Sequence, residues 1–206
     1  MISSTDITAV IIAGGKGSRL GGLDKGLMLY NGQPFISTII TRIQSQVANI
    51  AINANRNQAR YAQYNYPVFG DMLSDISSHL QDDYQGPLAG FVSAMQQVRT
   101  PYIITVPCDV PCLPHDLVSR LCHAQHKQQA EIAIAHDGER SQFLHALLSV
   151  SLQKDLLHFL QDGKRSVGQW YQQHSVALAD FSDQPHAFMN INTDEQYQQL
   201  EYNKDD

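Results

Sequence analysis

The segment from Thr8 to Gly26, TAVIIAGGKGSRLGGLDKG, constrains the fold more than any other part of this sequence. Its apolar run, residues 10–12, is typical of a strand that is buried on both faces. A cluster of glycines follows, with Lys16, Arg19 and Lys25 placed among them. Glycines let the backbone wrap an anion with its N–H groups pointing inward, and cations add charge-assisted contacts. The segment therefore predicts a buried strand that leads into a polyphosphate-binding loop.

Two common phosphate loops are excluded by the spacing of these residues. A Walker A loop requires Gly, four residues and then Gly-Lys-Ser/Thr, and no stretch of the chain has that order. The dinucleotide fingerprint G-x-G-x-x-G begins at Gly15 and Gly17 but has Leu20 in place of its third glycine. An ordinary glycine-rich surface turn is the structural alternative, and it leaves the interleaved cations directly after a buried strand unexplained.

Length and charge narrow the class of ligand. The chain has 206 residues, which favours a single domain over residues 1–206 with a sizeable core. Its formal net charge is -6, so we expect no broad basic surface for nucleic acid. A local basic loop in an acidic protein instead indicates a small anionic ligand.

The apolar segments, the N-terminal residues and the cysteines indicate the cellular compartment in which the protein works. No segment approaches the length of apolar chain that spans a membrane, and the N-terminal residues MISSTDI do not resemble a secretory signal. Cys108, Cys112 and Cys122 are odd in number, which argues against a disulfide framework. A zinc site with His115 or His123 is disfavoured because only one close cysteine pair is present. We therefore expect reduced thiols and a cytoplasmic protein without membrane contacts.

Predicted strands and helices alternate along the chain. The expected strands are 10–12, 49–54, 67–69, 102–106, 132–135, 146–150 and 176–180. Helices are expected from Pro34, over 87–97, from Pro114, over 152–160, around Trp170 and after a capping box formed by Thr193 and Gln196. This order predicts a three-layer α/β/α, Rossmann-like fold whose sheet is mostly parallel.

Polar residues follow the first four predicted strands. The glycine-rich loop follows the first strand, Asn53 lies at the end of the second, and Asp71 and Asp109 follow the next two. Ligands of such sheets bind outside the carboxyl ends of the strands. The pattern therefore predicts one nucleotide-sized site at that edge.

The residue types suit transfer chemistry on a phosphate. Asp109 follows an apolar strand, and a carboxylate beside a phosphate loop suits Mg²⁺, although such a residue can also cap a helix. We expect Lys25 to neutralise charge on the reacting phosphorus and Arg19 to hold a leaving pyrophosphate. No Ser or Cys lies in a nucleophile elbow, and Asp109 should raise the pKa of the Cys108 thiol. The nucleophile should therefore belong to the substrate.

Several blocks carry a resemblance to a known family. The residues IAGG, Lys16, Gly17, Arg19 and Asp24-Lys25 resemble the nucleotidyltransferase signature L-A-G-G-x-x-x-R-(M/L)-G…(D/P)-K. The later blocks INANRNQ, GPLAG, PCDVP, HDGER, Gly163-Lys164-Arg165 and FMNINTDEQ are similar to those of bacterial molybdenum cofactor guanylyltransferases. The similarity extends from Ile7 to Leu200, and the later blocks make it specific.

The resemblance implies a reaction and a set of site residues. GMP would pass from GTP to the terminal phosphate of molybdopterin or molybdenum-molybdopterin, with Mg²⁺, giving molybdopterin guanine dinucleotide and pyrophosphate. Transient contacts with other cofactor-biosynthesis proteins and molybdoenzyme chaperones would follow. The implied nucleotide-binding residues are Ile12, Ala13, Gly14, Gly15, Lys25, Asn53, Asp71 and Asp109, with Asp109 as the metal ligand. The implied pterin-side residues are Gly86, Gly90, Arg165, Asn190 and Asn192.

Guanine presents a pair of hydrogen-bond donors, so we expect the Asp71 carboxylate to help read the base. Two segments depart from the family pattern, namely the long stretch 72–85 and the residues SQFL at 141–144. A cytidylyltransferase acting on the same cofactor and a sugar-1-phosphate nucleotidyltransferase remain alternatives with the same fold. A non-catalytic nucleotide-binding module is a third, and the presence of both Lys25 and Asp109 argues against it.

Overall fold

A computed structural model describes residues 2–13, 24–72 and 86–190. Its main feature is a seven-stranded sheet with the strand order β5-β4-β1-β6-β8-β7-β9. The strands are β1 (Ile7–Ile12), β4 (Asn49–Asn53), β5 (Val68–Phe69), β6 (Tyr102–Pro107), β7 (Ile132–His136), β8 (Ser141–Ser149) and β9 (Val176–Asp180). Only β8 runs antiparallel to its neighbours in this sheet. The predicted mostly parallel sheet is confirmed.

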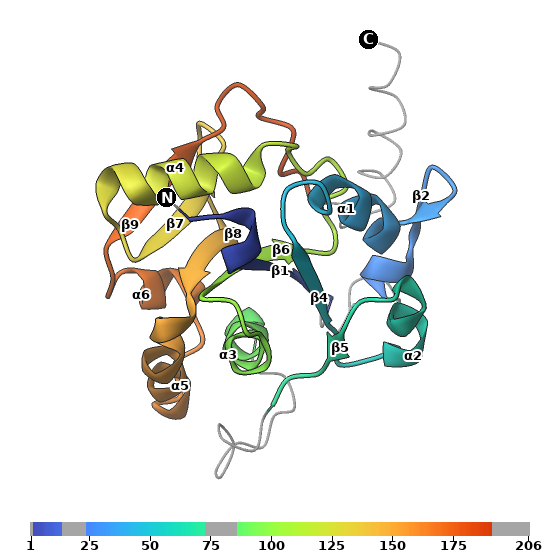
Figure 1. Ribbon diagram of the computed structural model, residues 1–206, viewed down its shortest axis with the longest axis horizontal. Coiled ribbons are helices and arrows are strands. Elements are labelled where there is room, and N and C mark those ends of the chain that lie inside the picture. Colours follow the sequence, from blue (N-terminus) through green and yellow to red (C-terminus); the bar gives the residue numbers. More distant parts are fainter. Residues whose placement is uncertain (1, 14–23, 73–85, 191–206) are drawn as a thin grey trace.

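Helices cover both faces of the sheet (Figure 1). Helices α1 (Phe35–Ile43) and α4 (Leu117–Gln128) lie on one face, and α3 (Pro87–Gln97) and α5 (Gln153–Gln161) lie on the other. The smaller elements are α2 (Gln58–Tyr61), α6 (Val167–Tyr171), a β2–β3 hairpin (Leu29–Tyr30 with Gln33–Pro34) and the 3-10 turns η1 (Ser4–Asp6), η3 (Lys25–Leu27), η4 (Ala62–Tyr64) and η5 (Val150–Leu152). The three-layer α/β/α architecture is therefore confirmed.

The central strand β1 explains why its sequence is almost uniformly apolar. Ile7 and Ile11 belong to the core beneath α1 and α4, whereas Val10 belongs to the core beneath α3. All three side chains are completely buried. Because each face of the strand meets a helical layer, apolar residues are required in consecutive positions rather than in alternation.

Three starts differ clearly from the sequence-based expectation. Strand β1 begins at Ile7, three residues before the apolar run 10–12. Strand β8 begins at Ser141, not at residue 146, because the polar residues Ser141 and Gln142 continue the antiparallel pairing with β7 past a register shift after Ile134. Helix α4 begins at Leu117, and Pro114 lies in the turn before it. The predicted cap at Thr193 and Gln196 lies outside the described residues. Among the described helices, none is long and apolar enough to cross a membrane.

Candidate active site

Four neighbouring strands are joined by backbone hydrogen bonds at their carboxyl ends. The Cys108 N–H donates to the Ile12 carbonyl at 3.1 Å, and the Ala13 N–H donates to the Asn53 carbonyl at 2.8 Å. The Ala54 N–H in turn donates to the Phe69 carbonyl at 2.8 Å. The chain therefore leaves β6, β1, β4 and β5 side by side, at the sheet edge where ligands bind in this class of fold.

Lys25 and Asp109 meet at this edge. The Lys25 Nζ lies 2.9 Å from Oδ2 of Asp109, although the two residues are distant in sequence. Their side chains are 24% and 15% exposed, so water only partly screens the pair. Lys25 is placed by the short 3-10 turn η3, and Asp109 by the chain that leaves β6. A cation and a carboxylate are thus held together beside the end of β1.

A second polar group lies at the ends of β4 and β5. The Asn53 side chain, 1% exposed as a residue, donates to Oδ1 of Asp71 at 3.0 Å. Asn55 donates to the other carboxylate oxygen at 2.8 Å and accepts from the Asp71 N–H at 2.7 Å. The carboxylate is therefore fixed by two amides. The contribution of Asn55 was not predicted; its position two residues after Asn53, in the INANRNQ block, is the signal that could have pointed to it.

Helix α3 packs directly against this group. An alanine Cβ at position 90 would lie 2.6 Å from Oδ1 of Asn53, so only glycine allows the observed approach. Gly86 caps the same helix with a φ of 75°, in the left-handed region that favours glycine. The Ser93 hydroxyl accepts from the Met72 N–H at 2.8 Å, which ties the chain after Asp71 to α3. Glycine is therefore required at both positions of the GPLAG block, at Gly90 by close packing and at Gly86 by its backbone conformation.

Asp24, the residue before Lys25, is held by hydrogen bonds from α2 and from the residue that precedes this helix. The Tyr61 hydroxyl donates to Oδ1 of Asp24 at 2.5 Å, and the Asn57 amide donates to Oδ2 of Asp24 at 2.9 Å. Burial, followed by nearby acidic groups that include Asp24, raises the pKa of Tyr61. The hydroxyl therefore stays protonated and able to donate. Neither Tyr61 nor Asn57 was singled out from the sequence, because no local pattern links them to Asp24.

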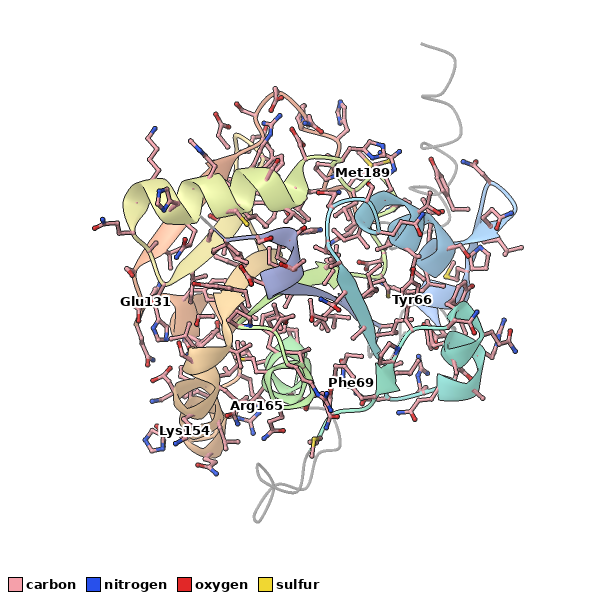
Figure 2. The ribbon with its side chains drawn as sticks, in the orientation of Figure 1. Tyr66, Phe69, Glu131, Lys154, Arg165 and Met189 are labelled. Atoms are coloured by element: carbon pink, nitrogen blue, oxygen red, sulfur yellow. The ribbon has the colours of Figure 1, made fainter. Side chains whose placement is uncertain are left out.

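The residues proposed for the pterin side are not gathered in one place. Figure 2 shows Arg165 on the side of the sheet covered by α3 and α5, and Met189 on the side covered by α1 and α4. Arg165 donates to the carbonyls of Leu160 and Lys164 at 2.7 and 2.6 Å, and burial lowers its pKa. Its own carbonyl oxygen would lie 3.9 Å from a Cβ at Gly86. Asn190, which follows Met189, is exposed.

Several predicted residues lie outside the described part of the chain. They are Gly14, Gly15, Lys16, Arg19 and Asn192. Of the remaining loop residues, Ala13 is buried and Ile12 is partly buried at the end of β1.

Cys108 is buried beside the site. Burial first, and then the neighbouring Asp109, raises the pKa of its thiol, so it remains protonated and a poor nucleophile. The direction predicted from the sequence is confirmed, although burial rather than Asp109 is the larger cause. Within residues 2–13, 24–72 and 86–190, no cluster of three or more His, Cys, Asp or Glu side chains is arranged to hold a metal ion.

The sheet, its helical layers and the polar strand ends agree with a nucleotidyltransferase, the class to which a family model assigns most of the chain. A model of the MobA-like NTP transferase domain matches residues 9–177. Molybdopterin-guanine dinucleotide biosynthesis protein A from Archaeoglobus fulgidus has the same fold, with a TM-score of 0.75 at 17% identity over 95% of this chain and 97% of that one.

Curated relatives are much closer in sequence. The molybdenum cofactor guanylyltransferase of Shewanella sediminis (strain HAW-EB3) is 48% identical over 96% of each chain. That of Shewanella frigidimarina (strain NCIMB 400) is 50% identical over 94% of this chain and 95% of its own. The chain belongs to the family of molybdenum cofactor guanylyltransferases.

Proposed function

We propose that this protein transfers GMP from GTP to the terminal phosphate of molybdopterin, with release of pyrophosphate. Family membership supports the reaction, and the observation that carries it in this chain is the 2.9 Å contact between Lys25 and Asp109 at the carboxyl edge of the sheet. Phosphoryl transfer uses a cation to stabilise charge on the phosphate oxygens and a carboxylate to hold a metal ion, and this pair supplies both groups at the same edge.

The reaction is a single displacement at phosphorus. An oxygen of the pterin phosphate attacks the α-phosphorus of GTP and forms a new P–O bond. The bond from that phosphorus to the bridging oxygen breaks, and pyrophosphate leaves with the electron pair. No protein side chain is needed as nucleophile, in agreement with the protonated state of Cys108. The protein supplies position and electrostatic stabilisation.

Lys25 is the residue assigned to the reacting phosphorus. On GTP binding its ammonium group donates hydrogen bonds to α-phosphate oxygens, where negative charge accumulates as the new bond forms. Its partial burial makes this interaction stronger than it would be in water. Arg19, which lies outside the described residues, is assigned to the leaving pyrophosphate on the basis of its place in the signature.

Asp109 fits Mg²⁺ by the chemistry of its donor group. Mg²⁺ prefers oxygen ligands and is usually held by one or two carboxylates together with substrate phosphates and water. The Asp109 carboxylate at the phosphate edge suits that mode of binding. Mg²⁺ bound there with the triphosphate supplies charge neutralisation on the phosphate oxygens.

The Asn53–Asp71–Asn55 group is assigned to the guanosine end of GTP. The two amides orient the Asp71 carboxylate, each of whose oxygens retains a lone pair for a further donor. The N1–H and amino groups of guanine provide such donors, whereas adenine lacks the N1–H in its normal form. Gly86, Gly90, Arg165, Asn190 and Asn192 remain assigned to the pterin side, and Gly90 in addition packs closely against Asn53 of the guanosine end.

The direct test is incubation of the purified protein with GTP, Mg²⁺ and molybdopterin. We expect pyrophosphate release that depends on all three, with CTP, ATP and a sugar 1-phosphate as comparison substrates. Lys25→Ala should lower the rate by roughly 150-fold, since one such donor contributes on the order of 3 kcal/mol. Lys154→Ala, which changes an exposed residue of α5, is the matched control and should leave the rate unchanged. Faster release with CTP than with GTP would favour a cytidylyltransferase.

Two wider expectations accompany this proposal. The product must reach enzymes that use it, so we expect transient contacts with other cofactor-biosynthesis proteins and with molybdoenzyme chaperones. A cytoplasmic location remains the prediction drawn from the sequence.

A further inference from the structure

A buried tyrosine, Tyr61, contacts the turn that carries Lys25 on both sides of the lysine. The Tyr61 hydroxyl donates to the carboxylate of Asp24, immediately before Lys25. Immediately after Lys25, an alanine Cβ at position 26 would lie 2.5 Å from that same hydroxyl oxygen and 3.3 Å from two ring carbons. Tyr61 therefore contacts the residues on both sides of Lys25, one through a hydrogen bond and the other through close backbone packing.

Tyr61 is itself held firmly. The residue is completely buried, and it belongs to the core cluster beneath α1 and α4. Its N–H donates to the Asn57 carbonyl at 3.2 Å, within the short helix α2. The side chain of Asn57 supplies the second hydrogen bond to Asp24. The three-residue lysine turn is therefore held through Tyr61 and Asn57, in addition to the packing of Leu27 against the core.

We infer that Tyr61 is a positioning residue for the transfer reaction, acting through Asp24 and Gly26 to hold the Lys25 ammonium group at the reacting phosphate. The inference rests on the function proposed above for Lys25. The hydrogen bond donated by the buried Tyr61 hydroxyl fixes the Asp24 side chain. The Tyr61 ring packs against the backbone at Gly26 and limits how far that backbone can move toward it. Without the hydroxyl, Lys25 keeps its charge but not its fixed direction. Loss of the hydroxyl should therefore lower kcat more than it raises the KM for GTP.

The experiment is a double-mutant cycle between Tyr61→Phe and Lys25→Ala in the full-length protein. Initial rates of pyrophosphate release are measured with GTP, Mg²⁺ and molybdopterin, using more enzyme and longer times for the lysine variant. Tyr61→Phe should lower kcat about tenfold when Lys25 is present, since small displacements of a catalytic group are costly. In the Lys25→Ala background the same change should cost less than about twofold, because the group being positioned is gone.

Two further variants separate positioning from folding. Tyr64→Phe removes a neighbouring hydroxyl whose partner is Ser37, and it should leave kcat unchanged. Asn57→Gly removes the other Asp24 contact at an exposed residue whose φ is already 51°, so the backbone suits glycine. It should lower kcat about threefold, with the loss again confined to the background that retains Lys25. Asn57→Gly also keeps the core intact if Tyr61→Phe fails to fold.

The outcomes distinguish the inference from the proposed function. Equal fold-losses from Tyr61→Phe in both lysine backgrounds, or full activity in Tyr61→Phe, would overturn the positioning role while the transferase activity stands. An unmodified protein that releases no pyrophosphate would instead overturn the proposed function, and the inference with it.

Discussion

Gly90→Ala should weaken GTP binding even though position 90 is assigned to the pterin side. The added Cβ would lie 2.6 Å from the Asn53 side-chain oxygen, well inside the 3.4 Å at which ordinary van der Waals contact begins. Neither partner has room to retreat, because Gly90 is in a buried helix and Asn53 is 1% exposed. The Asn53 amide must therefore rotate and release Asp71.

The size of the effect follows from the bond that is lost. A hydrogen bond to a charged acceptor contributes about 1.5–3 kcal/mol. Asp71 keeps its two contacts with Asn55, so we take the lower end of that range, which corresponds to roughly a tenfold rise in the KM for GTP. Steady-state pyrophosphate release at varied GTP, with molybdopterin saturating, measures this directly.

The matched control is Gly168→Ala in helix α6. There a Cβ would lie 3.5 Å from the Phe143 ring, which is ordinary contact, and alanine favours helix by about 1 kcal/mol over glycine. This variant should retain its KM for GTP and melt at the same temperature as the unmodified protein or slightly above it. A Gly90→Ala protein whose KM rises for the pterin alone, with that for GTP unchanged, would refute the reasoning from Asn53.

Three other perturbations give separate expectations. Asp71→Asn should reduce the preference for GTP over ATP, measured as a ratio of kcat/KM, and an unchanged ratio would contradict a base-reading role. EDTA should stop pyrophosphate release and excess Mg²⁺ should restore it; activity that persists in EDTA would exclude the metal. His145 is buried without a hydrogen-bond partner among the described residues, and burial lowers its pKa from 6.5 to about 3. Below pH 6.5 the unfolded chain binds a proton at His145 that the folded chain does not bind. The free energy of unfolding should therefore decrease as the pH is lowered, by about 2 kcal/mol at pH 5. Thermal melts of His145→Leu should show a shallower loss between pH 7 and pH 5, and identical slopes would contradict the assignment.

Much of the fold could be predicted from local sequence signals. The uninterrupted apolar run of β1 and the apolar spacing of α1 are direct consequences of burial, and the structure has both elements. The turn of the β2–β3 hairpin also has a local cause, since Asn31 and Gly32 both adopt the positive φ that these residue types favour. The start of β8 was not predicted, because its first residues are polar and their pairing depends on β7 rather than on their own composition.

The candidate site could be predicted as a set of residues but not as a set of contacts. Asn53, Asp71 and Asp109 were found because each lies at or just after the end of a strand, and parallel strands end at one edge. Their pairing, Asn53 with Asp71 and Lys25 with Asp109, depends on packing that no local pattern encodes. Tyr61 is the clearest example, since its hydroxyl contacts a residue 37 positions earlier in the chain. Such supporting contacts become visible only when the layers are assembled.

The central claim is that this chain joins the guanylyl group of GTP to a pterin phosphate. The most direct measurement uses GTP labelled at the α-phosphorus, purified protein, Mg²⁺ and molybdopterin, with the products separated and identified by mass. We predict that the label appears in molybdopterin guanine dinucleotide and that one pyrophosphate is released for each molecule formed. Label that stays in GTP, or that enters a product only when CTP replaces GTP, would contradict the account.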